Sequence, residues 1–240
     1  MQSDLPRTPR NREATNLALA RHTAFASMFC ALVSIVVALA LDFTSIIPLL
    51  AGKKAYNPIR EFISYQVDTD SGTIMTGVFL LLAVAAWSYA GAAYLAPARH
   101  TNRTNLLATF LFGWGVFVGA AFRAVPQAEI AADHFLKGSA RMHDVGVGFG
   151  FVPAMLAAFM DQRRIVFGRV PGFFLTKLSF WMILVGAVGT ALAVLAFKDV
   201  AGLMQRVFII GIILWLATEA HELFWLSAEE AHRSKTPLDD

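Results

Sequence analysis

The stretch TAFASMFCALVSIVVALAL, residues 23–41, decides the fold class of this chain. It contains no charged side chain, and a helix that spans a bilayer needs about 20 mostly apolar residues. Five further runs of mostly apolar residues occur at 73–95, 106–122, 145–160, 173–197 and 207–226. None of them alternates polar with apolar residues, as the strands of a membrane barrel would. The sequence therefore predicts an all-α, polytopic transmembrane helix bundle with six spans.

The composition indicates a single membrane domain. Of the 240 residues, 57% are hydrophobic and 15% are charged, whereas soluble domains carry about 25% charged residues. We expect the membrane domain at residues 23–226, between an N-terminal tail, residues 1–22, and a C-terminal tail, residues 227–240. The net charge of +3 comes from basic residues in the short flanks of the apolar runs, so no nucleic-acid partner is predicted. The single cysteine, Cys30, can form neither an internal disulfide nor a cysteine metal cluster.

The positions of Lys and Arg predict the orientation of the bundle. The densest basic groups lie in the two tails and in the connections after the second and fourth spans. Cytoplasmic loops carry an excess of these residues. We therefore expect both termini in the cytoplasm and the long connections 42–72 and 124–144 outside. The Ala-x-Ala pattern at residues 38–40 resembles a signal-peptide cleavage site. The apolar stretch before it is longer than a signal core, so we interpret it as an anchor helix.

Small residues spaced four apart predict close contacts between helices. Such pairs occur in four spans: Ala86 and Ala90, Gly115 and Gly119, Gly146 and Gly150, and Gly189 and Ala193. The run GVGFG at 146–150 is therefore interpreted as a packing surface. It is not typical of a nucleotide loop, because no strand precedes it and no phosphate-binding lysine follows. Four of the five tryptophans are expected to face lipid or another subunit: Trp114, Trp181, Trp215 and Trp225.

The pair His143-Asp144, where the fourth span begins, has two interpretations that the sequence leaves open. One is a catalytic or zinc site at the external face, because catalytic zinc takes three protein ligands from His, Asp, Glu and Cys. The other, which we favour, makes Asp144 the N-cap of the helix, where a carboxylate accepts backbone N–H bonds. The catalytic candidates are Ser64, His143 and Asp144, and the metal candidates are Asp133, His134, His143 and Asp144. No cofactor is expected under the second interpretation, and zinc is implied by the first.

Three arginines flank the helix ends on the predicted external face: Arg123, Arg141 and Arg206. An arginine can hold a phosphate with two parallel hydrogen bonds, so these residues are candidates for binding lipid head groups. The alternative is that their side chains only extend along apolar surface toward the membrane–water interface. The sequence does not decide between the two.

The segment ATEAHELFW, residues 217–225, carries ionisable residues within the last apolar run. Charged groups at such depth are costly and mark functional sites by default. Glu219, His221 and Glu222 are therefore candidates for a proton or ion pathway. The favoured alternative is structural pairing, with Lys177 at the start of the fifth span neutralising one carboxylate. A haem with two axial histidines is not predicted, because no second histidine lies at the depth of His221.

Several short motifs together resemble the domain-of-unknown-function family 998. They are NPIREFIS at 57–64, GTIMTGVFLLL at 72–82, FRAVP at 122–126, GSARMHDVGVGFGFV at 138–152 and GLMQRVFIIGIILWL at 202–216. The resemblance implies a six-helix membrane protein of bacteria or archaea and no established activity. The family pattern reads Ile-Ser-x-Leu-Gly where this chain has ISYQV, residues 63–67. The family also tends to have an Asp after the proline, where this chain has Gln127 after Pro126.

Our leading hypothesis for function is a non-enzymatic accessory or assembly subunit in the cytoplasmic membrane of a prokaryote. It would bind membrane lipids or a larger membrane protein complex. One alternative is a metal-dependent hydrolase that acts on a lipid of the external leaflet. The other is an ion or proton pathway through Glu219 and Glu222.

Overall fold

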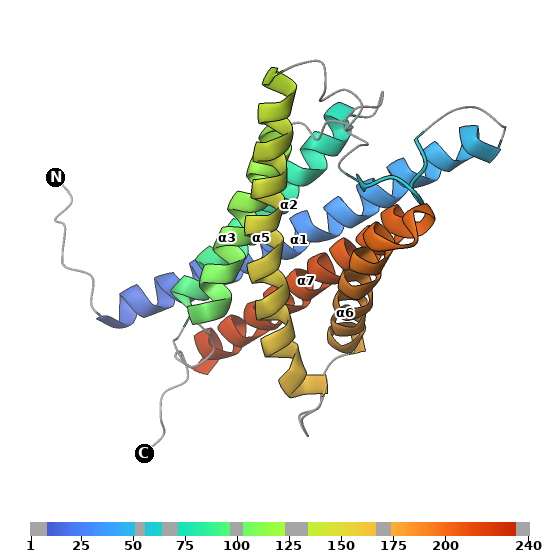
Figure 1. Ribbon diagram of the computed structural model, residues 1–240. Coiled ribbons are helices and arrows are strands. Elements are labelled where there is room, and N and C mark those ends of the chain that lie inside the picture. Colours follow the sequence, from blue (N-terminus) through green and yellow to red (C-terminus); the bar gives the residue numbers. More distant parts are fainter. Residues whose placement is uncertain are drawn as a thin grey trace.

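The computed structural model describes residues 9–50, 56–63, 72–96, 103–122, 134–166 and 174–233. These ranges are helical almost throughout and contain no strand (Figure 1). The elements are α1 (Pro9–Leu50), α2 (Gly72–Leu95), α3 (Arg103–Ala121), α5 (His134–Val166), α6 (Phe174–Leu195), the short 3-10 helix η3 (Lys198–Val200) and α7 (Ala201–Arg233). Six of the helices are long and apolar enough to cross a membrane. The predicted all-α bundle with six spans is therefore confirmed.

Several helices extend beyond the apolar runs that predicted them. With 42 residues, α1 is about 63 Å long at 1.5 Å per residue, about twice the thickness of the hydrocarbon core of a bilayer. Asp42, expected as the first residue of an external connection, lies inside this helix. The helix that contains the fourth span, α5, begins at His134 instead of near residue 145. The last helix continues to Arg233, beyond the predicted start of the C-terminal tail. Apolarity locates the middle of each helix and not its ends, because polar residues also form helix outside the lipid.

The helices pack in the order α6, α7, α1, α2, α3 and α5, and a sparser contact between α5 and α6 completes the circuit. Helix α7 also touches α2 and, more sparsely, α5. We call the end of the bundle where α1 and α6 finish and α7 begins the loop end. The opposite end, where α1 begins and α7 finishes, is the terminal end (Figure 1). The seam between α5 and the α6–α7 pair is thus the loosest of the main packing surfaces.

The contact between α3 and α5 is built on the glycines that the sequence singled out. A Cβ atom added to Gly150 would lie 2.8 Å from the Cα of Gly115, and one added to Gly115 would lie 2.5 Å from the carbonyl oxygen of Gly146. Cβ atoms do not approach backbone so closely, so only glycine permits this separation of the two helices. The prediction that GVGFG is a packing surface is confirmed.

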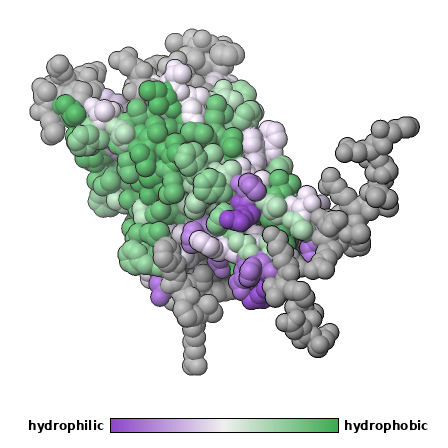
Figure 2. Space-filling view, turned by 180° about the vertical axis from the view of Figure 1, so that it is seen from behind, coloured by the Kyte–Doolittle hydropathy of each residue, from purple (hydrophilic) through white to green (hydrophobic). Residues whose placement is uncertain are grey.

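The core and the outer surface are both apolar. Phe112, Ile212, Trp215 and Leu216 are fully buried in the interior. Trp114, Trp181 and Trp225 are exposed as expected, but Trp215 has no exposed surface, so the expectation that it faces outward is wrong. Figure 2 shows a broad, continuous hydrophobic face on one side of the molecule. A surface of this kind suits contact with lipid chains.

Candidate functional site at the loop end

The segment 56–63, which contains most of the NPIREFIS motif, forms a compact turn at the loop end. The side-chain oxygen of Asn57 accepts a hydrogen bond from the N–H of Ile59 at 3.0 Å. The carbonyl of Asn57 accepts the N–H groups of Arg60 at 3.2 Å and Glu61 at 2.8 Å. Asparagine favours such turns because its side chain can replace a backbone acceptor, and the fixed φ of Pro58 suits the next position. Local sequence therefore explains the shape of the segment.

The same segment is docked on the first turns of α7. The N–H of Leu203 donates to the carbonyl of Ile59 at 2.9 Å, and the side-chain oxygen of Gln205 accepts the N–H of Ile63 at 2.9 Å. A Cβ atom added to Gly202 would lie 2.8 Å from both the N of Glu61 and the carbonyl oxygen of Pro58. Gly202 is thus required for the close approach. An exposed ion pair joins Arg60 to Asp199 at 3.3 Å, and pairs of this kind contribute little.

Arg206 of α7 is the centre of a buried polar network. Its Nε donates to Oδ2 of Asp42 at 2.6 Å, and its Nη2 donates to Oδ1 at 2.8 Å. Nη1 donates to the carbonyls of Glu61 at 2.9 Å and Gly202 at 3.1 Å. Nη2 also donates to the hydroxyl of Tyr56. A guanidinium has five N–H donors, so every donor of Arg206 is used inside the protein.

Tyr56 connects this network to the turn. Its hydroxyl group accepts the bond from Arg206 and donates to the carbonyl of Phe62 at 3.0 Å. Burial raises the pKa of the Tyr56 phenol well above its usual value, although the neighbouring Arg206 acts in the opposite direction. The phenol is therefore neutral and can serve as donor and acceptor at once. Helix α1, segment 56–63 and helix α7 are held together at this point.

The three arginines predicted to bind lipid head groups do not form a common site in the part of the chain that is described. Arg206 has no N–H left for a phosphate, because all five are bonded to protein acceptors. Arg141 is exposed on α5. Arg123 lies outside the described residues. A head-group role for Arg206 in this conformation is therefore not supported.

His143 is buried between α5 and α3. Its Nδ1 lies 3.0 Å from the carbonyl oxygen of Gly119 and 2.9 Å from that of Phe122. Two carbonyls at one nitrogen require that Nδ1 carries a hydrogen, which satisfies acceptors at the C-terminal end of α3. Gly119 leaves room for the ring, since a Cβ atom there would lie 3.8 Å from Cε1 of His143.

The favoured N-cap interpretation of Asp144 is wrong. Helix α5 begins at His134, so Asp144 lies well inside it. Asp144 is exposed whereas His143 is buried, and the two side chains therefore do not face one site. The described side chains contain no group of three metal-ligating residues. Ser64 and Asp133 lie outside the described residues, as does the side chain of His134, so the set of zinc candidates stays a prediction.

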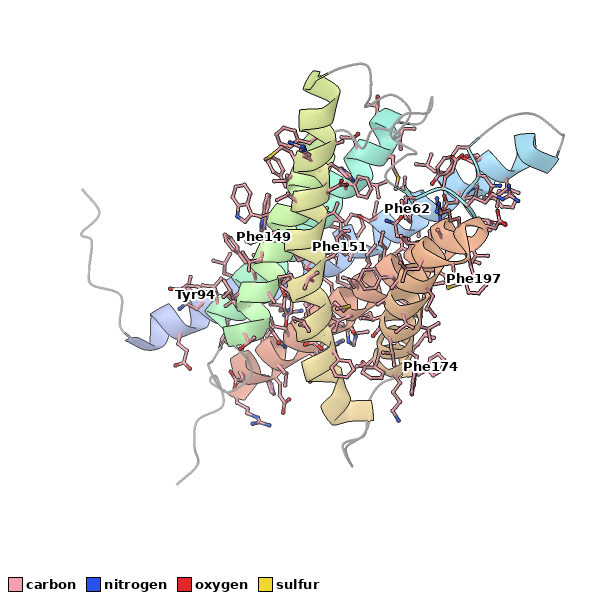
Figure 3. All side chains as sticks on the ribbon, in the orientation of Figure 1. Phe62, Tyr94, Phe149, Phe151, Phe174 and Phe197 are labelled. Carbon is pink, nitrogen blue, oxygen red and sulfur yellow. The ribbon has the colours of Figure 1, made fainter. Side chains whose placement is uncertain are left out.

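A cavity of about 40 Å³ lies beside His143 at the loop end. Its lining comes from segment 56–63, α2, α3, α5 and α7: Ile63, Phe79, Val116, Gly119, His143, Val147, Phe151, Gln205 and Ile209. Figure 3 shows Phe151 and Phe149 on opposite sides of α5, so the cavity side of this helix is distinct from its outer side. Water needs only about 10–15 Å³, so the space accommodates a small group.

A second, smaller cavity of about 20 Å³ adjoins the first. Ile63, Phe79 and Ile209 line both cavities, while Asp42 and Arg206 line only the second. Three apolar side chains thus lie between the cavity beside His143 and the buried ion pair. Among the described residues that line the cavity beside His143, two have polar side chains, His143 and Gln205.

The ionisable residues of the last span lie toward the terminal end. Glu219 is half-buried and accepts a long hydrogen bond from the hydroxyl of Tyr89 at 3.5 Å. His221 is exposed, and its Nε2 accepts the indole N–H of Trp225 at 3.0 Å. Lys177 and Glu222 are exposed. Among the described residues no ion pair joins Lys177 to either glutamate, so the predicted bridge is not formed in this structure.

Sequence reasoning missed Asp42, Tyr56 and Gln205. A signal existed for the first of these. Asp42 ends the first apolar run and Arg206 precedes the last, and unlike charges at corresponding depths of two spans usually pair. Nothing comparable marks Gln205, because its role depends on where segment 56–63 docks.

The fold and this site define the class of protein as a multi-pass helical membrane protein. At one end, segment 56–63 is hydrogen-bonded to α7 beside a mainly apolar cavity. The profile of the family described as "Protein of unknown function (DUF998)" matches residues 35–221, and the chain belongs to this family. Comparisons with curated proteins and with solved structures gave no significant match.

Proposed function

We propose that this protein is a non-enzymatic membrane protein that binds a membrane lipid in the cavity beside His143. The observation that carries the proposal is the cavity itself, whose described lining is apolar except for two side chains and belongs to the membrane domain. Small-molecule sites are typically lined by hydrophobic side chains with a few polar groups that fix the ligand. In this proposal the cavity admits one end of the lipid, and the acyl chains of the lipid lie in the loosely packed seam between α5 and the α6–α7 pair.

The proposal includes a cellular localisation and an orientation in the membrane. The distribution of Lys and Arg supports cytoplasmic termini, with the loop end outside, in the cytoplasmic membrane of a prokaryote. The exposed apolar residues of α1 and α6 leave room for contact with a larger membrane complex as well as with lipid. Phe25, Phe29 and Trp181 are examples.

A photoactivatable fatty acid fed to cells tests the proposal without assuming a head group. We expect cross-links to the cavity residues of α5 and α7, in addition to cross-links on the exposed helix faces that contact bulk lipid. Val147→Trp fills the cavity, and Val145→Trp is the matched control, because Val145 is 63% exposed on the same helix. Cross-linking to Ile209 should be lost in the first variant and kept in the second.

The result depends on folding, so both variants are compared by thermal melting in detergent. If Val147→Trp does not fold, Val116→Leu fills the same cavity from α3 with a smaller change. Cavity cross-links that are missing from the wild type, or equal in all variants, would contradict lipid binding at this site.

A further inference from the structure

The hydrogen bonds of His143 determine what its free nitrogen offers to a ligand. Nδ1 carries its hydrogen toward the carbonyls of Gly119 and Phe122. In the neutral ring the other nitrogen, Nε2, is then an acceptor. No partner of Nε2 occurs among the described residues, and His143 lines the cavity. One hydrogen-bond acceptor is thus available there.

Gln205 supplies the complementary group. Its Oε1 accepts the N–H of Ile63 at 2.9 Å, which assigns the two ends of the amide. The Nε2 group then has donors to offer, and within the described part of the chain nothing accepts from them. Because Gln205 also lines the cavity, its described lining offers one acceptor atom on His143 and one amide NH2 group as donor on Gln205.

The described residues that line the cavity include no positively charged side chain. Arg206 is close by, but its five donors bind Asp42, Tyr56, Glu61 and Gly202. Ile63, Phe79 and Ile209 lie between it and the cavity beside His143. An anionic phosphate placed there would lose its hydration without gaining a cation from the described lining, which is costly.

We infer that the ligand is a neutral lipid with one free hydroxyl group. This inference rests on the proposed lipid binding and specifies the chemistry of the ligand. A hydroxyl has one donor and accepts as well, so it donates to Nε2 of His143 and accepts from the amide of Gln205. The hydroxyl end occupies the small cavity, and the acyl or alkyl chains remain among the helices.

Three photoactivatable lipids with identical chains test the inference in nanodiscs of phosphatidylcholine. Diacylglycerol has the free hydroxyl, its O-acetyl ester lacks the hydroxyl donor, and phosphatidic acid replaces the hydroxyl with a phosphate. We expect diacylglycerol to label the cavity residues roughly tenfold more than either of the others, the effect of one or two hydrogen bonds.

Two variants test the proposed roles of His143 as acceptor and Gln205 as donor. His143→Asn keeps a donor for the carbonyls at the end of α3 and removes the Nε2 acceptor. Gln205→Glu keeps an acceptor for Ile63 and removes the donor. Both should reduce labelling by diacylglycerol roughly tenfold, and His143→Asn should thereby abolish the preference for diacylglycerol over its O-acetyl ester. Asp144→Asn, at an exposed neighbouring position, should change neither.

The outcomes separate the two proposals. No labelling of cavity residues by any of the three lipids would contradict lipid binding itself. Cavity labelling in which phosphatidic acid equals or exceeds diacylglycerol would leave lipid binding standing and overturn the neutral hydroxyl. Equal labelling by diacylglycerol and its O-acetyl ester would overturn it as well.

Discussion

The guanidinium of Arg206 on α7 and the carboxylate of Asp42 on α1 form a bidentate ion pair. Nε lies 2.6 Å from Oδ2, and Nη2 lies 2.8 Å from Oδ1. Both residues are buried, with 6% and 8% of their surface exposed. Removing two charges from water is expensive, and their attraction offsets this cost only when further hydrogen bonds satisfy the remaining atoms. The carbonyls of Glu61 and Gly202 and the hydroxyl of Tyr56 supply those bonds. The pair therefore fixes the position of segment 56–63, which provides Ile63 to the cavity.

Breaking this pair from one side should destabilise the bundle strongly. Asp42→Asn leaves the Arg206 charge buried without a counter-ion, a change that typically costs about 3–5 kcal/mol. We expect a large loss in the free energy of unfolding, measured by reversible denaturation in mixed micelles. The double variant Asp42→Leu with Arg206→Met removes both charges and should recover much of that loss.

The exposed pair at the same end of the molecule is the control. Arg60→Ala removes the contact with Asp199, whose side chain is 79% exposed. Such a change should cost no more than about 1 kcal/mol. If the loss of unfolding free energy in the Asp42→Leu/Arg206→Met double variant equalled the sum of the losses in its two single variants, the energetic coupling of Asp42 and Arg206 would be contradicted.

Tyr56 makes a prediction about alkaline pH. Its pKa in the folded protein is raised by burial above the usual value of about 10. Below pH 10 the phenol is neutral in both states, and its contribution to stability is complete. Above pH 10 the unfolded chain loses the proton first, so the free energy of unfolding falls as pH rises. Tyr56→Phe should be less stable at neutral pH and should show a shallower decline between about pH 10 and 11. Parallel wild-type and variant curves would contradict the assignment.

The helices were predictable from sequence because the cost of exposing backbone polar groups to lipid leaves helix as the only structure for a long apolar run. The α3–α5 contact was predictable for a related reason, since Gly146 and Gly150 give their helix a surface without side chains. The ends of the helices were not predictable. Asp42 stops the apolar run, yet the helix continues because a partner on α7 neutralises its charge.

The site was less accessible to sequence reasoning than the fold. The sequence singled out His143, which the structure places beside the cavity. Its neighbour Asp144 faces away because adjacent residues of a helix differ by about 100° in direction. The cap interpretation assumed that the helix starts where the apolar run starts. The roles of the His143 and Gln205 side chains depend on contacts with α3 and with segment 56–63, which are distant in sequence.

The glycines of α3 and α5 provide a matched pair of substitutions. Gly115→Ala places a methyl group 2.5 Å from the carbonyl oxygen of Gly146, whereas Gly148→Ala meets no atom within 4 Å. The first should destabilise by about 1–3 kcal/mol through overpacking. The second should be neutral or stabilise by up to about 1 kcal/mol, because alanine favours helix over glycine. Unfolding in mixed micelles measures both, and equal effects would contradict the close α3–α5 contact.

The orientation can be tested by cysteine labelling. In a Cys30→Ala background, a cysteine at Ala128, between α3 and α5, should react with a membrane-impermeant maleimide added to intact cells. A cysteine at Asn102, between α2 and α3, should react only after the cells are opened. The reason is the excess of Lys and Arg at the terminal end. Labelling of Asn102→Cys in intact cells would reverse the assignment.

The neighbours His143 and Asp144 should respond in opposite ways to substitution. His143→Ala leaves the carbonyls of Gly119 and Phe122 without their donor, and unsatisfied buried groups cost about 1–3 kcal/mol each. Asp144→Ala removes an exposed side chain from the interior of a helix, where changes usually stay within about 0.5 kcal/mol. His143→Asn restores a donor and should recover part of the loss in unfolding free energy. If Asp144→Ala were the more damaging change, α5 would begin near residue 144 and the structure of this region would be different. If all three variants were equally stable, the bond from Nδ1 to the end of α3 would not hold the ring, and the orientation of His143 toward the cavity would lose its physical basis.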